Sequence, residues 1–122
     1  MTILESYISL PSMRFYAYHG VIPQERIVGA EYLVDLQVKT DFTQALLKDD
    51  LDGTINYALI HEIVKEEMEI PSKLLEHVAG RISKHQLEAF PAIEQIKLGI
   101  SKQNPPMGAD NTCAGVSITV TR

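Results

Sequence analysis

The sequence of 122 residues contains a single cysteine and no long apolar run. One thiol, Cys113, cannot form an internal disulfide or supply a cysteine-rich metal cage. No apolar stretch approaches the roughly 20 residues needed to span a bilayer. The first ten residues also lack the basic start and long apolar core of a signal peptide. We therefore expect a cytoplasmic protein in a reducing compartment, with no membrane partner and with Cys113 buried or half-buried.

Positive charge is also scarce. Lysine and arginine number 11 against 16 aspartates and glutamates, which gives a formal net charge of -5, and no basic run occurs anywhere. This balance argues against nucleic acid or an anionic membrane surface as a partner. The length is close to that of one domain, so we expect a single domain over residues 1–122.

The common catalytic signatures are missing as well. The sequence has no G-x-S-x-G, no P-loop and no G-x-G-x-x-G, which leaves serine hydrolase, NTPase and dinucleotide-binding readings without support. Its histidines form no H-x-H or HExxH pair, and their spacing does not bring three or four ligands together. We expect no metal site, and we interpret these histidines as structural or surface residues: His19, His61, His77 and His85.

What is present is clear periodicity. Residues 7–20 read as an extended pair or as one long bent strand interrupted at Pro11 and Ser12. In residues 31–42, apolar side chains alternate with mostly polar ones, which is typical of a half-buried antiparallel strand. The alternation returns in residues 92–101 and 115–121. The apolar face of the first of these segments consists of Tyr32, Val34, Leu36 and Val38.

Between the strands the apolar period becomes helical. We expect one helix from residue 55, closed by Pro71, and a second over residues 73–90 with Ser72 as its N-cap. The predicted buried stripe of the first helix is Leu59, Ile60, Ile63, Val64 and Met68. That of the second is Leu75, Val78, Ile82 and Leu87.

The element order of strand, strand, helix, helix, strand, strand predicts an α+β fold. Both helices would cover one face of a four-stranded antiparallel sheet and would be inserted between strands two and three. The edges of an open sheet must be paired, covered or blunted, and neither outer strand carries much protecting charge. We therefore expect sheet edges to join between subunits in a ring-like homo-oligomer.

Four side chains occupy positions where chemistry is often found. Glu25 follows a strand on a predicted loop, Tyr57 and Glu76 lie in first helical turns, and Lys102 ends a strand just before Asn-Pro-Pro. Each also has an ordinary explanation, because charges are common at such places and Glu76 complements a helix dipole. These patterns alone leave the choice open.

Four segments in register carry a resemblance: "MRFYAYHGVIPQERIVGAEYLVDLQV", "TINYALI", "LLEHVAGRI" and "ISKQNPP". Together they resemble the dihydroneopterin aldolases of the folate pathway over nearly the whole chain. The resemblance implies the tunnelling fold, with sheets joined into a ring of four subunits that is often stacked as an octamer. It implies a pterin substrate and no cofactor.

The resemblance also implies roles for matching residues. Glu76 would hold the amino-pyrimidinone edge of the pterin, because a carboxylate accepts two parallel hydrogen bonds from adjacent N–H groups. The backbone groups of Leu75 and Ile55 would line the same edge. Tyr57, contributed by a neighbouring subunit, would lie near the reacting side chain and, with Glu25, would also contact the substrate. The catalytic residues implied are Lys102, Tyr57 and Glu25.

The implied chemistry is a retro-aldol cleavage without metal or Schiff base. The C6=N5 imine of the pterin accepts the electrons released when the C1'–C2' bond breaks. Lys102, acting through water, would serve as the base, and the two prolines after it would hold its strand end rigid. A lysine is a weak base at its ordinary pKa of about 10.4, so this role needs a lowered pKa or a proton relay.

Two departures from the family pattern are visible: Ala17 where many members have glycine, and Asn56 where some have histidine.

Two alternative functions stay open. One is an epimerase of dihydroneopterin or its triphosphate, although the lysine-proline segment and the lack of an evident arginine or lysine cluster for a triphosphate argue against it. The other is a catalytically silent pterin-binding module, which would be expected to lack Lys102 or Tyr57.

Overall fold

The computed structural model describes residues 1–103 and 113–122. The two prolines that follow Lys102 in the sequence therefore lie outside the described residues. The elements, in chain order, are β1 (Tyr7–Ala17), α1 (Pro23–Val28), β2 (Ala30–Lys39), α2 (Thr43–Lys48), the 3-10 turn η1 (Leu51–Gly53), α3 (Tyr57–Met68), α4 (Leu75–Ala89), β3 (Gln95–Gln103) and β4 (Cys113–Thr121).

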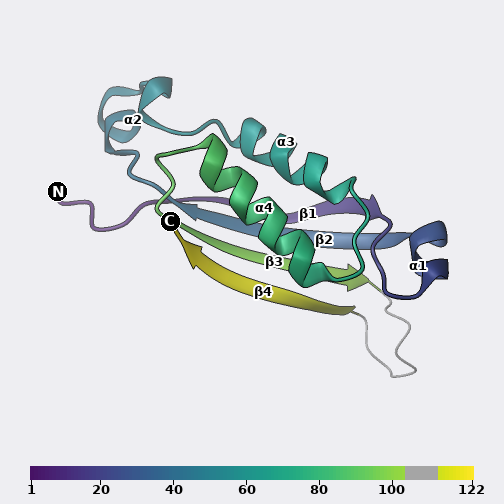
Figure 1. Ribbon diagram of the computed structural model, residues 1–122. Helices are drawn as coiled ribbons and strands as arrows, with labels where there is room; N and C mark the ends of the chain where they lie inside the picture. The colour runs from purple at the N-terminus through teal and green to yellow at the C-terminus, as the bar shows by residue number, and fades with distance from the viewer. Residues whose placement is uncertain (104–112) are drawn as a thin grey trace.

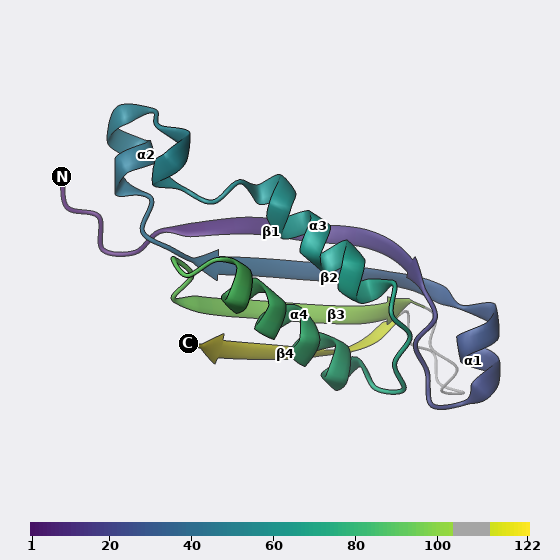
Figure 2. The same ribbon diagram turned by 45° about the horizontal axis from the view of Figure 1, so that its top comes forward.

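The strands form one antiparallel sheet in the order β1-β2-β3-β4. Helices α3 and α4 are inserted between β2 and β3 and cover one face of this sheet, as Figures 1 and 2 show. Helix α3 packs against α4 and β1, and α4 also packs against β3 and β4. The predicted α+β arrangement is confirmed. The short helices α1 and α2 were not predicted, because six residues are too few to display a helical period.

The core lies between the sheet and the two helices. The predicted alternation along β2 is confirmed, since its four apolar side chains are at most 2% exposed. The stripe of α3 is also largely confirmed, because Ile60, Ile63, Val64 and Met68 are buried. Leu59 was assigned to the stripe wrongly, because it is 54% exposed.

Helix α4 begins later than predicted. Leu74 occupies the N-cap position, so the assignment of Ser72 as N-cap is wrong. The groups of Ser72 are engaged elsewhere: its carbonyl accepts from the Gly20 amide at 2.9 Å, and its hydroxyl accepts from Arg81 at 2.9 Å. Val78 and Ile82 are buried as expected, and the flanking Leu75 and Leu87 are half-buried against the core.

Strand β1 is one bent strand. Its pairing with β2 shifts register between Leu10 and Met13, and Ser12 adopts a φ of 53°, which few residues other than glycine adopt. The Ser12 amide donates to Asp35 Oδ1 at 2.7 Å, which holds the bulge in place. The predicted interruption at Pro11 and Ser12 is therefore a bulge inside a continuous strand.

The outer strand β4 has a neighbour on one side only. Its apolar residues Val116, Ile118 and Val120 pack against the core but remain half-buried. Cys113, at the start of this strand, is exposed, so the expectation of a buried or half-buried thiol is wrong. Across the described residues, no helix combines the length and apolar character needed to cross a membrane.

Candidate functional site

An ion pair between Lys102 and Glu25 lies at the end of the sheet where β3 finishes. The Lys102 ammonium group donates to Glu25 Oε2, and the two side chains are only 13% and 20% exposed. Lys102 comes from the penultimate position of β3, and Glu25 comes from α1, which follows β1. A charge pair this sheltered is screened less by solvent than a surface pair.

Glu25 is fixed from several sides. It was predicted to lie on a loop, but it lies in the short helix α1, which starts at Pro23. Its Oε1 accepts from the Ile22 amide at 3.2 Å, as in a capping box. A Cβ atom at Gly20 would lie 2.8 Å from Glu25 Cδ, so only glycine lets the carboxylate pack this closely. Both carboxylate oxygens therefore have defined partners.

The ion pair changes the acidity of the carboxyl group. The hydrogen bond from Lys102 lowers the pKa of Glu25 below its ordinary value, the Ile22 amide adds to this effect, and partial burial opposes it. Glu25 is therefore ionised near neutral pH. The pair places one carboxylate and one ammonium group side by side, which is an arrangement suited to proton transfer.

Glu76 and Leu75 form the first turn of α4, and this turn lies at the same end of the sheet as α1 and the end of β3 (Figures 1 and 2). Glu76 is exposed, and Leu75 is half-buried. The linker before α4 contacts the loop between β1 and α1 through the hydrogen bond from the Gly20 amide to the Ser72 carbonyl. Glu25, Lys102 and Glu76 therefore lie at the same end of the sheet.

Tyr57 and Ile55 lie at the other end. Tyr57 is the first residue of α3 and is 67% exposed, whereas Ile55 is buried just before it. Helix α3 has 12 residues and runs toward the α1 end, so its start lies about 18 Å from its finish. One chain therefore does not bring Tyr57 and Ile55 together with Lys102.

An apolar pocket of about 430 Å³ surrounds this second group. Ile55 and Tyr57 line it together with Phe42 from the start of α2, Leu46 from α2 and Leu51 from η1. Leu46 and Leu51 are 45% and 69% exposed, so the pocket is open to solvent in a single chain. An exposed apolar surface of this kind is typical of an interaction site.

His19 also lies near the Lys102–Glu25 pair, although it was not predicted to be a site residue. Its side chain is buried, and its Nδ1 accepts from the Ser72 amide at 3.1 Å. Burial, with help from the charges of Arg81 and Lys102, lowers the pKa of His19 to about 4. From its sequence context it was interpreted only as a structural or surface histidine. The sequence carries no signal for its contact with Ser72, because the two residues are 53 positions apart.

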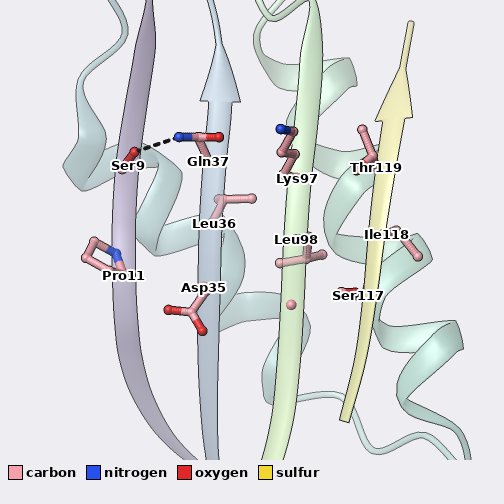
Figure 3. A pocket seen from close by; sticks show the side chains of 11 residues that line it. Ser9, Pro11, Asp35, Leu36, Gln37, Lys97, Leu98, Ser117, Ile118 and Thr119 are labelled. Carbon is pink, nitrogen blue, oxygen red and sulfur yellow. Dashed lines mark hydrogen bonds between the residues drawn. The ribbon is translucent and has the colours of Figure 1, made fainter.

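A further pocket, of about 520 Å³, lies on the face of the sheet that carries no helices. Figure 3 shows its lining: polar side chains such as Asp35 and Lys97 project from the strands, and the helices lie behind the sheet. Gly99 leaves room at its centre. No predicted site residue lines it, and it contains no close acid–base pair, so we place the candidate site at the Lys102 end.

Within residues 1–103 and 113–122, no three His, Cys, Asp or Glu side chains gather in a way that could hold a metal ion. His61 and His77 are exposed on separate helices, and His85 is paired with Glu67, 3.1 Å away.

Comparison with known proteins gives a consistent result. A family model described as dihydroneopterin aldolase matches residues 8–121. A dihydroneopterin aldolase from Staphylococcus epidermidis is 37% identical over 116 residues, which cover 94% of this chain and 96% of that protein. One from Streptococcus pyogenes is 37% identical over 112 residues, covering 91% and 94%.

The solved structures agree at the level of the fold. The structure of E. coli dihydroneopterin aldolase in complex with neopterin matches with a TM-score of 0.85 and 23% identity. The match covers 94% of this chain and 98% of the E. coli chain. At this identity the likeness shows the fold alone, and the tunnelling fold expected from the sequence is confirmed.

Proposed function

This chain belongs to the dihydroneopterin aldolase family, and from that premise we propose that it cleaves 7,8-dihydroneopterin in folate biosynthesis. The products are 6-hydroxymethyl-7,8-dihydropterin and glycolaldehyde, so the enzyme is a lyase. The observation that carries the proposal is the sheltered Lys102–Glu25 pair, which lies at the same end of the sheet as Glu76. That end offers an acid–base pair and an exposed carboxylate for binding.

In this proposal Glu76 binds the pterin ring. Its carboxylate accepts two parallel hydrogen bonds from the amino-pyrimidinone edge, and the backbone of Leu75 adds a contact beside it. The exposure of Glu76 at the start of α4 supports this role, because the carboxylate is accessible to a ligand. The positive end of the α4 dipole lies beside this carboxylate and complements its charge.

The proposed reaction moves electrons into the pterin. A base removes the 2'-hydroxyl proton, the C1'–C2' bond breaks, and C2' leaves as the aldehyde carbon of glycolaldehyde. The electron pair of the broken bond forms C1'=C6, and N5 takes up a proton. Protonation of C1' and loss of the N5 proton then give the hydroxymethyl product. Because the ring accepts the electrons, the reaction requires neither metal nor covalent lysine.

Lys102, through a water molecule, is the proposed base. Its ion pair with Glu25 supports a relay, in which the ammonium group first passes a proton to the carboxylate and the amine so formed then accepts the 2'-hydroxyl proton through the water. Tyr57 assists near the reacting side chain. These assignments make turnover depend on Lys102 and substrate affinity depend on Glu76.

The complete site requires a second copy of the chain. Tyr57 and the backbone of Ile55 lie at the end opposite Lys102, so we propose that a neighbouring subunit contributes them, in a tetrameric ring or a stacked octamer. Exposed apolar side chains at both ends support such head-to-tail contact. They include Val21, Ile22, Ile27 and Val28 at the α1 end, and Leu46, Leu47 and Leu51 at the α2 end. We place the assembly in the cytoplasm.

Incubation of the purified protein with 7,8-dihydroneopterin in the presence of a metal chelator tests the proposal. We expect both products to appear at an undiminished rate. Formation of the 2'-epimer alone would assign an epimerase instead, and tight pterin binding without turnover would assign a silent binding module. A rate that falls with chelation would contradict the metal-independent route.

A further inference from the structure

The linker between α3 and α4, residues 69–74, is held from two sides. From the loop between β1 and α1, the Gly20 amide donates to the Ser72 carbonyl at 2.9 Å, and His19 Nδ1 accepts from the Ser72 amide at 3.1 Å. From α4, the Arg81 guanidinium donates to the Ser72 hydroxyl at 2.9 Å and to the Ile70 carbonyl at 3.0 Å. Ser72 is thus bonded through its amide, its carbonyl and its hydroxyl.

The contact with Ser72 determines the protonation of the His19 ring. A peptide amide can only donate, so Nδ1 is the acceptor and the ring proton is on Nε2. The charged groups acting on the ring are Arg81 from α4 and Lys102 from β3, which favour the neutral form. Tyr32 from β2 packs edge-on at 5.2 Å, and its hydroxyl donates to the His19 carbonyl at 2.9 Å. The imidazole is therefore neutral near pH 7.

An apolar ring would avoid one cost that histidine incurs. Nε2 of His19 is buried and has no hydrogen-bond partner among the described residues. Leaving a buried donor unpaired is unfavourable, and phenylalanine would fill a similar volume without one. What the imidazole adds is the Nδ1 acceptor for the Ser72 amide.

The segment of residues 19 and 20 contacts both parts of the proposed site. Gly20 packs directly against the Glu25 carboxyl group, which is bonded to Lys102. His19 bonds to Ser72, and the chain enters the first turn of α4 three residues later, where Glu76 lies. The distance between the Glu76 carboxylate and the Lys102–Glu25 pair therefore depends on the hydrogen bonds between this segment and the linker.

We infer that His19 is a positioning residue of the pterin site, which fixes the linker through Nδ1 and thereby sets the place of Glu76 relative to the Lys102–Glu25 pair. This inference rests on the proposed function, since it assigns pterin binding to Glu76. It predicts an effect on substrate affinity rather than on the chemical step.

Two substitutions separate this role from simple packing. His19→Phe keeps the ring and removes the acceptor, whereas His19→Asn offers Oδ1 at the same bond distance from the backbone as Nδ1. We expect His19→Phe to raise KM for 7,8-dihydroneopterin and Kd for neopterin about five-fold, the loss expected for one hydrogen bond, with kcat within about two-fold of wild type. His19→Asn should recover most of the lost affinity. Rates are normalised to the folded fraction, measured by circular dichroism.

The outcomes distinguish the inference from the function on which it rests. If wild type cleaves the substrate and His19→Phe keeps wild-type KM and Kd, the positioning role is overturned and the aldolase assignment stands. If His19→Phe lowers kcat with KM unchanged, or if His19→Asn recovers nothing, the role is also wrong. If wild type binds neopterin without cleaving anything, the aldolase assignment fails, and the Kd values alone decide the role of His19. If wild type neither binds nor cleaves a pterin, both proposals fail together.

Discussion

The two ends of this molecule are built differently. At the α1 end, Glu25 and Lys102 form a sheltered ion pair, and both carboxylate oxygens have partners. At the α2 end, Tyr57 is 67% exposed and borders an open apolar pocket. The first end carries the ion pair of the proposed acid–base site, and the second exposes the apolar surface where we propose that a neighbouring copy binds.

The contrast explains how a small chain can build an enzyme site. A prepared acid–base pair reduces the reorganisation needed during reaction, because its partners are already in place. An exposed apolar end is removed from water when another copy covers it, and this burial is favourable and drives assembly. The proposed site thus combines a rigid half from one copy with a half that a neighbour supplies.

Replacing the lysine should produce the largest loss. Lys102→Ala removes the proposed base and is expected to lower kcat about 1000-fold, while Kd for neopterin changes less than about five-fold. Steady-state kinetics and fluorescence titration measure the two quantities. Lys97→Ala, on the helix-free face of the same strand, is the matched control and should behave like wild type. Equal losses of affinity in Lys102→Ala and Glu76→Ala would refute the assigned roles.

Mixing variants tests whether two copies share a site. Lys102→Ala and Tyr57→Ala should each be nearly inactive alone. If one copy supplies Lys102 and its neighbour supplies Tyr57, co-expression in equal amounts should leave about one site in four intact and restore a corresponding share of activity. Activity that stays at the level of the separate variants would place both residues in the same chain.

Replacing the binding carboxylate should affect affinity. Glu76→Ala removes a charged acceptor of two hydrogen bonds and should raise Kd for neopterin about 30-fold, the effect expected for losing a charge-assisted pair. Glu62→Ala, which removes an exposed carboxylate from α3, is the control. A drop in kcat with unchanged Kd in the Glu76 variant would argue against the proposed binding role.

The smallest effect concerns acid stability. Folded His19 has a pKa of about 4, below the ordinary value of about 6.5 that it regains on unfolding. Between these values the unfolded chain binds more protons, so the free energy of unfolding should fall as the pH drops from about 6.5 to about 4. Urea titrations at several pH values measure this slope. His19→Phe should flatten it, and an unchanged slope would show that another group is responsible.

Much of the fold could be predicted because it depends on local periodicity. The alternation at Tyr32, Val34, Leu36 and Val38 identified the face of β2 that is buried, and the helical period identified most of α3. The errors arose where tertiary contacts decided the outcome. Ser72 is a good N-cap residue by type, but its bonds to Gly20 and Arg81 leave the capping position to Leu74.

In the candidate site, too, some features could be predicted from the sequence and others could not. The residue types and their register were enough to nominate Glu25, Tyr57, Glu76 and Lys102 from the sequence, and their catalytic and binding roles remain predictions. The pairing of Lys102 with Glu25 joins residues 77 positions apart and could not be derived from spacing. His19 was classed without a role, because a lone histidine carries no periodic signal and only folding places Ser72 against it.

The sequence by itself determined the order of the four strands and the two long helices, the buried face of β2 and the family. These depend on patterns within a few neighbouring residues, and on residue types that any homologous chain displays in the same order. The tertiary structure alone decided which distant side chains meet, and it separated Tyr57 and Ile55 from Lys102 by the length of α3. Contacts of that kind depend on how the helices cross the sheet, and that packing becomes visible only in the folded chain.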